Sequence, residues 1–472
     1  MPTYALTTLG CKVNQYDGQS LAAALEGHGL RASGGAPADL VVVNSCCVTV
    51  AAMHKSRYAI RRALQRSPGA AVLVAGCYSD IDAKSLAGML AALGVPADKT
   101  FIAGHQDNLP GTIRRIARSF AGGAAQDNGD NRAPAGSTGP DATPPAGIKS
   151  RRLAAVRKNS AAGDAMPTLS HFAGHQRAFV KVQDGCDALC SYCIVPFARS
   201  VVWSRAIPEV LDECRHLIAS GHREIVLSGV FLGAYGRPTA VRRNWSGPGT
   251  LPELVRRVAA LPGLHRLRLS SLEPMDLDDE LLDVCRQSPT VARHFHLPLQ
   301  SGSGRLLERM NRQYTISQYR DMVTRLRQAL DRPALTTDII VGFPGEGDED
   351  FQATLEVARF AGFSRMHAFP FSPIEPTAAW VWRKEAPAAS VVKARMQVLA
   401  ALGRELSETY CRQFVGETTD AIVEKASAAA QATTERYLVA HFTNSKPPAR
   451  LGEVVHLQVL GLRGDGLLAQ RL

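Results

Sequence analysis

Three cysteines in the middle of the chain have the spacing of a metal or cluster site. Cys186, Cys190 and Cys193 form the pattern C-x3-C-x2-C directly after the apolar run 178–183, which is typical of a strand. Positions i, i+4 and i+7 also fit one face of a buried helix, but Gly185 and the adjacent aspartates indicate a loop. Structural zinc needs four protein ligands, and this loop has no fourth Cys or His. Three thiolates on a four-iron cluster leave one iron open to a small molecule. We call these cysteines the contiguous triad.

A second set of cysteines, here called the dispersed triad, is spread through the first third of the chain. Cys11, Cys46 and Cys77 each follow a short apolar run, and helical patterns follow. Loops after parallel strands gather at one sheet edge, so we expect the three thiols to converge and to hold a second iron-sulfur cluster. A separate core role for each cysteine is the alternative. If the backbone is still extended there, Cys47 is expected to point elsewhere, because side chains alternate along extended backbone.

The pattern of predicted elements divides the chain into four parts. Residues 1–121 alternate strand and helix patterns, which indicates an α/β domain with a parallel sheet. Residues 122–170 are rich in Gly, Ala, Pro, Asn and Asp and predict a flexible linker. Residues 171–411 contain six strand-like runs separated by helical segments, which predict a partial (β/α)6 barrel. Residues 412–472 have short strand-like runs punctuated by glycines and predict a small β-barrel.

Polar residues and glycines follow the strands of the predicted central barrel. Chemistry in such barrels lies at the C-terminal ends of the strands, although each of these residues is individually more typical of a turn. The candidates for cofactor contacts include Ser228, Gly229, Ser270, Ser271, Glu273, Gln300, Ser301, Gly302, Gly342, Pro344, Gly345, Ser372 and Pro373.

Composition limits the class of protein. Lys+Arg 54 against Asp+Glu 43 gives a net charge of +11, which would attract a polyanion such as nucleic acid. The N-terminal residues lack the pattern of a signal peptide, and no apolar run is long enough to span a bilayer. We therefore expect a cytoplasmic protein with no membrane partner. Ten cysteines in such a chain indicate metal or redox chemistry more than disulfides.

Several segments together resemble the methylthiotransferases of the radical S-adenosylmethionine superfamily. They are QDGCDALCSYCIVPFAR, HLPLQSGSGRLLERMNRQYT, TTDIIVGFPGE and the three segments around the dispersed triad. The resemblance covers nearly the whole chain. It implies that the contiguous triad holds a 4Fe-4S cluster whose open iron binds S-adenosylmethionine, which is then cleaved to a radical. It also implies that the dispersed triad holds an auxiliary 4Fe-4S cluster linked to sulfur donation, and that the cofactor pocket is lined by Tyr192, Gly229, Glu273, Gln300 and Val341.

The segment TLGCKVNQYDGQ is similar to the branch of the family that acts on threonylcarbamoyladenosine beside the tRNA anticodon. Lys12, Val13 and Asn14 carry this similarity. It implies exchange of the hydrogen on carbon 2 of the adenine for a methylthio group, with tRNA and a flavodoxin-type or ferredoxin-type electron donor as partners. Alternatives are isopentenyladenosine in tRNA or an aspartate of a ribosomal protein as substrate. From a different class, an RNA-binding iron-sulfur redox sensor would bind tRNA without cleaving S-adenosylmethionine.

The C-terminal part resembles the TRAM RNA-binding module that ends the chains of this family. Lys425, Arg436 and Arg450 are candidates for contacts with RNA phosphates. Tyr437 and Phe442 are interpreted as packing residues in preference to stacking platforms. The sequence departs from the family pattern at residues 200–203 and 373–376. We expect these departures to change contacts with the substrate and to leave both clusters unaffected.

Overall fold

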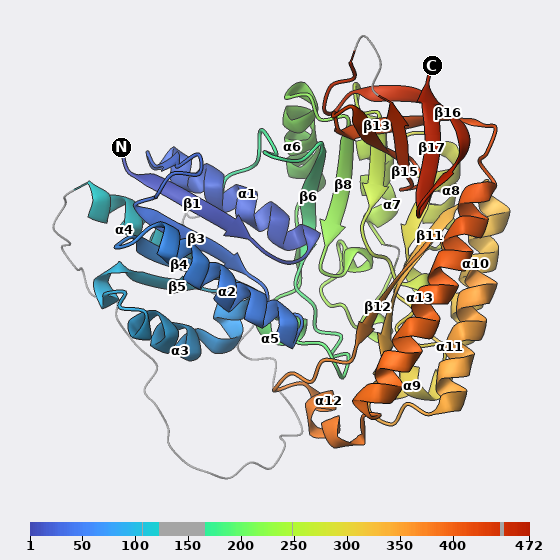
Figure 1. Cartoon of the computed structure of the whole chain (residues 1–472), viewed down its shortest axis with the longest axis horizontal. Helices are drawn as coiled ribbons and strands as arrows, with labels where there is room; N and C mark the ends of the chain where they lie inside the picture. The colour runs from blue at the N-terminus through green and yellow to red at the C-terminus, as the bar shows by residue number, and fades with distance from the viewer. Residues whose placement is uncertain (106, 122–165, 248, 444–447) are drawn as a thin grey trace.

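The computed structural model describes residues 1–105, 107–121, 166–247, 249–443 and 448–472 (Figure 1). The linker predicted for residues 122–170 therefore lies outside the described residues as far as position 165. No helix in the described ranges combines the length and the apolar character needed to span a bilayer.

A parallel five-stranded sheet forms the N-terminal part, in the order β2-β1-β3-β4-β5 (Figure 1). Its strands are β1 (Thr3–Thr8), β2 (Arg31–Ala32), β3 (Leu40–Ser45), β4 (Ala71–Gly76) and β5 (Thr100–Ala103). The helices around it are α1 (Lys12–Gly27), α2 (Val50–Arg66), α3 (Cys77–Ala92) and α4 (Leu109–Phe120). All the strands run in one direction, so their C-terminal ends meet at one edge. The α/β domain expected from the sequence is confirmed.

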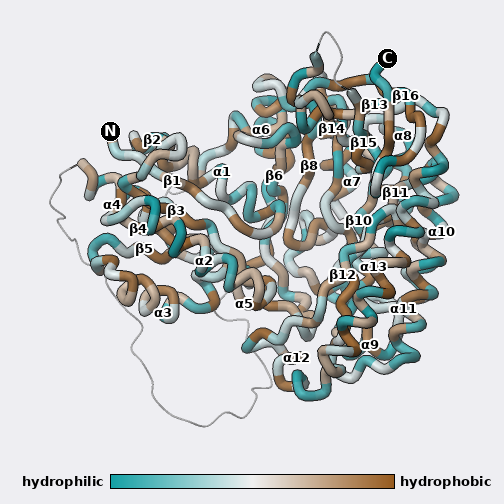
Figure 2. Tube along the Cα trace, in the orientation of Figure 1, coloured by the Kyte–Doolittle hydropathy of each residue, from teal (hydrophilic) through white to brown (hydrophobic). Residues whose placement is uncertain are grey.

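Alternation along β3 assigns the helices to opposite faces of this sheet. Leu40 and Val42 belong to a core cluster with residues of α1 and α4, whereas Val41 and Val43 belong to one with residues of α2 and α3. Every residue of β3 and β4 is buried, as expected for central strands covered on both faces. Hydrophilic and hydrophobic residues alternate along the covering helices, as in amphipathic helices (Figure 2).

Six parallel strands form the central part in two joined sheets, β7-β6-β8-β9 and β10-β11-β12. A bridge between Leu267 and Val291 connects them. The strands are β6 (Arg177–Asp184), β8 (Glu224–Gly229), β9 (Arg266–Leu269), β10 (His294–His296), β11 (Ala334–Val341) and β12 (Arg365–Pro370), with the short antiparallel β7 (Trp203–Ser204). The predicted partial (β/α)6 barrel is confirmed.

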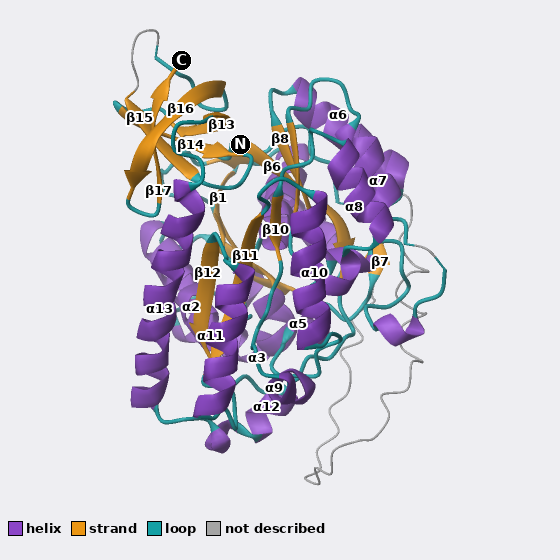
Figure 3. Ribbon diagram, turned by 90° about the vertical axis from the view of Figure 1, so that its right-hand side faces the viewer, coloured by secondary structure: helices purple, strands orange, loops and turns teal. Residues whose placement is uncertain are grey.

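Helices cover the outside of this central barrel, and α10, α11 and α13 lie beside β11 and β12 (Figure 3). The helices are α5 (Val195–Ala198), α6 (Ile207–Ala219), α7 (Leu251–Ala259), α8 (Asp279–Gln287), α9 (Gly304–Arg309), α10 (Ile316–Ala329), α11 (Asp348–Ala361), α12 (Ala378–Val381) and α13 (Ala389–Arg412). One large core joins the helices to the strands. The loops after the strands are thereby held at a common edge.

The C-terminal part is a closed five-stranded barrel in the order β13-β14-β15-β17-β16. Its strands are β13 (Thr418–Lys425), β14 (Ala429–Thr434), β15 (Val439–Thr443), β16 (Val454–Arg463) and β17 (Gly466–Arg471). Phe442 is buried in its core, as the packing interpretation predicted. Tyr437 instead leaves the barrel and stacks on His294 of the central barrel, with ring centroids 4.7 Å apart.

Buried charges attach this small barrel to β8 and β9. Glu224 pairs with Arg266 and Arg268 at 3.1 and 2.8 Å. The same two guanidiniums donate hydrogen bonds to the main-chain carbonyls of Thr433, Thr434, Glu435 and Asp420. Because burying unpaired charges is costly, the mutual pairing holds the two parts in a fixed contact.

Candidate functional site

The contiguous triad lies in the loop after β6, and a tight backbone turn sets its position. Gly185 has a φ of +79°, and a Cβ added there would lie 1.9 Å from the carbonyl oxygen of Val201, so only glycine fits. The Cys186 N–H donates to the Arg199 carbonyl at 3.0 Å, and the Cys193 N–H donates to the Cys190 carbonyl at 2.9 Å. All three thiols are free and half-buried. The loop therefore presents three thiols close together at the end of a barrel strand.

Arg312 places a positive charge beside this triad. Its guanidinium donates to Cys190 Sγ and to the Tyr192 hydroxyl, both at 3.3 Å, and pairs with Glu273 at 2.7 Å. The Arg312 side chain is only 7% exposed. A buried cation next to a thiol favours the thiolate, which is the form that binds metal. Arg312 lies in the segment ERMNRQYT, where nothing in the sequence pattern distinguishes it from other arginines.

The dispersed triad assembles at the C-terminal edge of the N-terminal sheet. Cys11 is the N-cap of α1, Cys46 follows β3, and Cys77 is the first residue of α3. A Cβ added to Gly10 would lie 3.0 Å from Cys46 Sγ, and Cys77 Sγ lies 3.8 Å from the side chain of Asn14. Burial raises the pKa of Cys46 to about 11, and the nearby Cys77 and Cys11 raise it as well. The three cysteines that the sequence predicts to converge do so.

Cys47 differs from its expectation, because its thiol lies beside Cys77. A hydrogen bond from Cys47 lowers the pKa of Cys77, against burial that would raise it, and the Arg199 guanidinium lowers it further. Strand β3 ends at Ser45, so the alternation of an extended chain does not govern Cys46 and Cys47. A fourth thiol therefore borders the dispersed triad.

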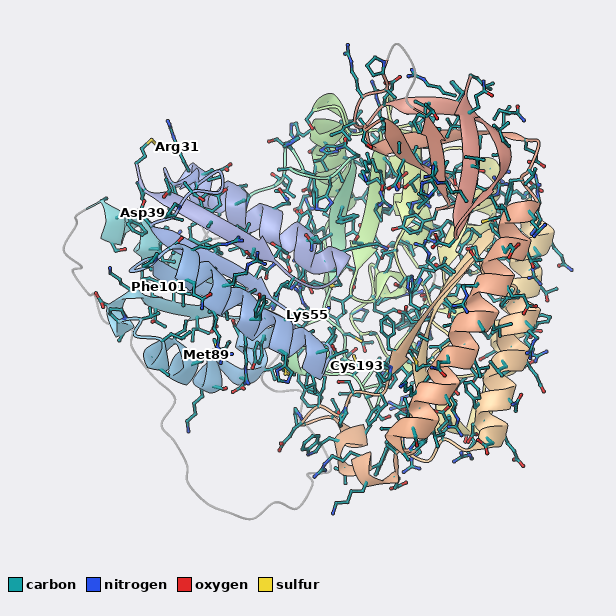
Figure 4. The ribbon with its side chains drawn as sticks, viewed as in Figure 1. Arg31, Asp39, Lys55, Met89, Phe101 and Cys193 are labelled. Atoms are coloured by element: carbon teal, nitrogen blue, oxygen red, sulfur yellow. The ribbon has the colours of Figure 1, made fainter. Side chains whose placement is uncertain are left out.

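Arg199 connects the two triads. Its carbonyl accepts the Cys186 N–H, and its Nε donates to Cys77 Sγ at 3.3 Å. Its Nη2 donates to Asn14 at 2.9 Å, in the helix that follows Cys11. Its side chain is 3% exposed. The two triads are also near enough that Cys77 contributes to a pKa of about 12 at Cys193, where burial is the main cause. Figure 4 shows Cys193 where the N-terminal sheet meets the central barrel.

Two carboxylates balance the positive charges of Arg199 and Lys181. Arg199 pairs with Asp184 at 2.8 Å and with Asp17 at 2.6 Å, and Lys181 pairs with the same two carboxylates at 2.9 and 2.5 Å. Burial alone would raise the pKa of Asp184, but the neighbouring Arg199 and Lys181 charges lower it to about 2. Asp17 belongs to α1, whereas the other three residues belong to the central part. The network therefore fixes one triad relative to the other.

The cofactor candidates lie at one edge, with unequal access. Ser228 is fully buried, and Val341 is almost so. A Cβ on Gly229 would come within 3.0 Å of the Gln183 side chain, and Gln300 adopts a left-handed φ of +60°. Glu273 is occupied by Arg312 and Arg242, and Ser271 is half-buried beside it. Tyr192 follows β6, Ser271 and Glu273 follow β9, and Gln300 follows β10, whereas Ser228 and Gly229 end β8 and Val341 ends β11. All of them therefore lie at the C-terminal ends of barrel strands, as the barrel pattern predicts.

The RNA candidates are divided between surface and interior. Lys425 and Arg450 are exposed. Arg436 is 11% exposed, pairs with Asp331 at 3.1 Å and with Glu435, and donates to the Arg332 carbonyl at 3.2 Å. It sits on the β14–β15 turn, which packs against the central barrel. Arg436 therefore joins the two barrels and is not presented to a ligand.

Cationic and aromatic side chains gather inside the central barrel, below the small barrel. The guanidiniums of Arg177 and Arg268 lie 5.0 and 4.8 Å from the ring centroid of Tyr437. Burial lowers the pKa of Lys12, and among its neighbours Arg268 and Arg177 lower it further whereas Tyr437 opposes this. Across the described ranges the half-buried Lys12 ammonium has no hydrogen-bond or ion-pair partner. Within the described part of the chain, Lys12 is therefore an unpaired cation that lies near Arg177 of β6 and Arg268 of β9.

The two segments that depart from the family pattern line the junction of the parts. Val201 approaches Gly185, and the Trp203 ring lies 5.6 Å from the Lys181 ammonium. The segment 373–376 lines a cavity of about 570 Å³ together with residues of α2, α3 and α5. Both departures lie next to the triads and contribute no thiol.

Each donor set consists of three thiols, the number that a four-iron cluster with one open iron needs. Among the described residues no group of three His, Cys, Asp or Glu side chains is arranged to hold one metal ion. In an iron-sulfur cluster each thiolate binds a different iron, so the thiols stand farther apart than around one ion. The candidate donors for such clusters are two sets of three thiols, each with an arginine donor 3.3 Å from one sulfur.

Comparison with known proteins supports this picture. The family described as Radical SAM superfamily matches residues 180–358, and Uncharacterized protein family UPF0004 matches residues 3–93. The chain is 32% identical to threonylcarbamoyladenosine tRNA methylthiotransferase MtaB of Chlamydia pneumoniae, over 90% of this chain and 87% of that one. It is 31% identical to the MtaB of Bacillus subtilis, over 98% and 94% of the two chains.

A relative with another name is about as similar. The tRNA-2-methylthio-N(6)-dimethylallyladenosine synthase of Anaeromyxobacter sp. is 32% identical over 98% of this chain and 93% of that one. Among solved structures, the radical S-adenosylmethionine methyltransferase TsrM from Kitasatospora setae superposes with a TM-score of 0.51 at 16% identity, covering 80% of this chain and 74% of that one, which shows a shared fold. With both triads in place and relatives of this length, the chain belongs to the radical S-adenosylmethionine methylthiotransferase family.

Proposed function

We propose that this protein adds a methylthio group to carbon 2 of threonylcarbamoyladenosine next to the anticodon of tRNA. The names of the relatives at 30 to 32% identity support this substrate. The observation that carries the activity is the pairing of two cysteine triads through one buried arginine, Arg199. A redox sensor without catalysis would not need a second triad beside the first, and this favours the enzyme.

Each triad would hold one 4Fe-4S cluster. Cys186, Cys190 and Cys193 would bind the first, leaving one iron for S-adenosylmethionine, and the dispersed triad would bind the second. With these groups bound, S-adenosylmethionine supplies both the methyl group and the radical that removes the hydrogen of the substrate. Tyr192, Gly229, Glu273 and Gln300 would lie around the cofactor, while Ser228 and Val341 would support it from buried positions.

The residues of the chain position these groups and exclude water. Arg312 supplies a buried positive charge to the Cys190 sulfur and the Tyr192 hydroxyl. Arg199 does the same for Cys77 and keeps the two triads at a fixed separation through its backbone and side chain. Fixed, buried charges need little reorganisation during a reaction, which is the physical advantage of this arrangement.

Lys12 is the residue that we assign to substrate choice. The threonyl group of threonylcarbamoyladenosine carries a carboxylate, whereas the isopentenyl group of the alternative substrate is uncharged. A half-buried cation that has no ion-pair partner among the described residues, near Arg177 and Arg268, suits an anionic substituent and is unfavourable for an apolar one. This favours the threonylcarbamoyl substrate over isopentenyladenosine and leaves a ribosomal protein aspartate as the remaining anionic alternative.

We also propose the setting in which the enzyme works. Residues 1–121 would act as the auxiliary-cluster domain, 171–411 as the radical domain and 412–472 as the RNA-binding module, joined by the linker 122–170. The electron donor would be a flavodoxin-type or ferredoxin-type protein, and the location cytoplasmic.

The test compares two RNA substrates with reconstituted protein. Anticodon stem-loops carrying threonylcarbamoyladenosine or isopentenyladenosine are incubated with S-adenosylmethionine and reductant, and nucleosides are analysed by mass spectrometry. We expect a methylthio product from the first RNA. Lys12→Met should lower that rate about tenfold or more, because a charge-assisted contact is lost, and Lys12→Arg should retain most of it. A product from the isopentenyl RNA alone would contradict the substrate assignment.

A further inference from the structure

Helix α2 has a basic surface that the fold does not require. Its sequence, VAAMHKSRYAIRRALQR, contains five Lys or Arg residues and no acid. Lys55, Arg61, Arg62 and Arg66 are exposed, and Tyr58 is 63% exposed. Only Ser56 and Ile60 of this helix are buried. The side of α2 that faces away from the sheet is therefore cationic along most of its length.

Four of these side chains form one row. Lys55, Tyr58, Arg62 and Arg66 are spaced three, four and four residues apart, so they lie above one another on a single helix face. We call them the α2 row. Arg62 and Arg66 are like charges at i and i+4, which destabilises an isolated helix by a small amount. A partner outside the helix is the physical reason to keep such a row.

Acidic residues do not neutralise the row. Throughout the described ranges Lys55, Arg61, Arg62 and Arg66 have no ion-pair partner. Arg57, on another side of the same helix, is different, since it lies 3.6 Å from Asp82 and donates to Ser85 at 2.9 Å. The exposed arginines of α7 are also paired, with Glu253. The row is thus available to an anion in a way that these other surface cations are not.

The α2 row borders a groove of about 840 Å³. Strand β1, helix α1 and the segment 168–173 form its other walls. One acid, Glu26, is among the described residues that line it, and the Tyr4 hydroxyl donates to Glu26 at 2.8 Å. A concave surface with cations along one wall fits an extended polyanion better than a compact ligand.

The position of α2 connects this groove with the two triads. The helix begins at Val50, four residues after Cys46, and the Val50 N–H donates to the Ser372 hydroxyl of the central part at 2.9 Å. From there α2 runs outward for 17 residues, which is about 25 Å. Figure 4 shows Lys55 on α2 and Cys193 near the start of this helix. The α2 row and the groove beside it therefore extend outward from the part of the molecule that holds the triads.

We propose that the α2 row binds the phosphate backbone of the tRNA anticodon stem. This inference rests on the proposed function for the identity of the RNA. Lys and Arg contacts to phosphates are independent of base sequence and fix the register of the nucleic acid. Tyr58, between Lys55 and Arg62, offers a flat ring to a ribose or an unpaired base. The row would hold the stem while the loop delivers its adenosine to the triads.

The test removes three charges from the row and, as a matched control, three elsewhere. Lys55→Gln/Arg62→Gln/Arg66→Gln is compared with Arg31→Gln/Arg115→Gln/Arg118→Gln, whose exposed arginines lie on β2 and α4. Binding of a fluorescent, unmodified anticodon stem-loop transcript to the full reconstituted chain is measured by anisotropy over a range of KCl. Equal iron content in both variants confirms that they fold.

We expect the row variant to bind at least about tenfold more weakly at low salt. The slope of log K against log salt should fall by about 2, since each phosphate contact contributes about 0.7 to 0.9. The control should keep the slope of the unaltered protein. Equal slopes for the two variants would overturn the proposal. The outcome is separable from the proposed function, because product formation by the unaltered protein is measured independently of this binding.

Discussion

The two triads are built in different ways. The contiguous triad occupies one loop, and its geometry follows from local features such as the left-handed turn at Gly185. The dispersed triad depends on the register of three strands, in which Thr8 is opposite Asn44 and Ser45 is opposite Gly76. A slip of one residue in that register would separate the thiols. A cysteine site made within one loop is visible in the sequence, whereas a site made by a sheet edge requires the topology.

Removing the contiguous triad should have the largest effect and best distinguish its role from that of the dispersed triad. In Cys186→Ala/Cys190→Ala/Cys193→Ala, we expect reductive cleavage of S-adenosylmethionine and the methylthio product to be lost, and iron content to fall by about half. The assay quantifies deoxyadenosine, product nucleoside and iron after anaerobic reconstitution. Retained cleavage would contradict the assignment of the radical chemistry to this loop.

Removal of the dispersed triad should have a narrower effect. Cys11→Ala/Cys46→Ala/Cys77→Ala is expected to lose about half of the iron and the methylthio product but to keep cleavage of S-adenosylmethionine, because the contiguous triad remains. The same three measurements apply. If cleavage also disappears while circular dichroism shows an intact fold, the triads do not divide the chemistry as proposed.

The arginines offer a comparison on stability. Arg199→Met removes the guanidinium shared by Asp17 and Asp184, and we expect the free energy of unfolding to fall by about 3–5 kcal/mol. Arg312→Met removes one ion pair, with Glu273, and should cost roughly half as much. Urea denaturation of both variants measures the difference. Equal losses would show that Arg199 does not connect the two parts energetically.

The smallest effect is expected at Cys47, the additional cysteine that lies beside Cys77 of the dispersed triad. Cys47→Ala removes the hydrogen bond to Cys77, worth about 1 kcal/mol, so product formation should fall about fivefold with iron content retained. Cys47→Ser keeps a donor and should stay near the unaltered rate. Cys285→Ala, a buried cysteine of α8, is the matched control. Loss of iron in Cys47→Ala would make Cys47 a ligand.

Much of the architecture can be predicted from the sequence. Apolar runs of the right length, separated by amphipathic segments, indicate the N-terminal sheet, the six barrel strands and the small C-terminal barrel. Convergence of Cys11, Cys46 and Cys77 follows from one rule on parallel sheets. Local sequence patterns therefore predict both the strands and helices and the sheet edge at which the cysteines gather.

Contacts between distant segments could not be predicted in this way. Arg199 and Arg312 resemble any other arginine in the sequence, and their roles arise from the packing of α1 and of the loop after α9 against the contiguous triad. Arg436 was expected at an RNA surface because of its charge alone, but its turn packs on Asp331. The exposed cations of α2 could not be predicted for the same reason. Which side of a basic helix faces solvent is determined by its packing against the sheet.

The attachment of the small barrel through main-chain carbonyls bears on how this chain can evolve. Arg266 and Arg268 donate to the carbonyl oxygens of residues 433–435, which every amino acid provides, so these hydrogen bonds persist whichever residues occupy those positions. Arg436 and Tyr437, by contrast, contact the central barrel through their side chains. Deleting the barrel, however, would remove the main-chain acceptors of these two guanidiniums and expose His294, the ring-stacking partner of Tyr437. The joint therefore tolerates substitutions at the positions that contribute only their carbonyls, but the C-terminal module is not detachable.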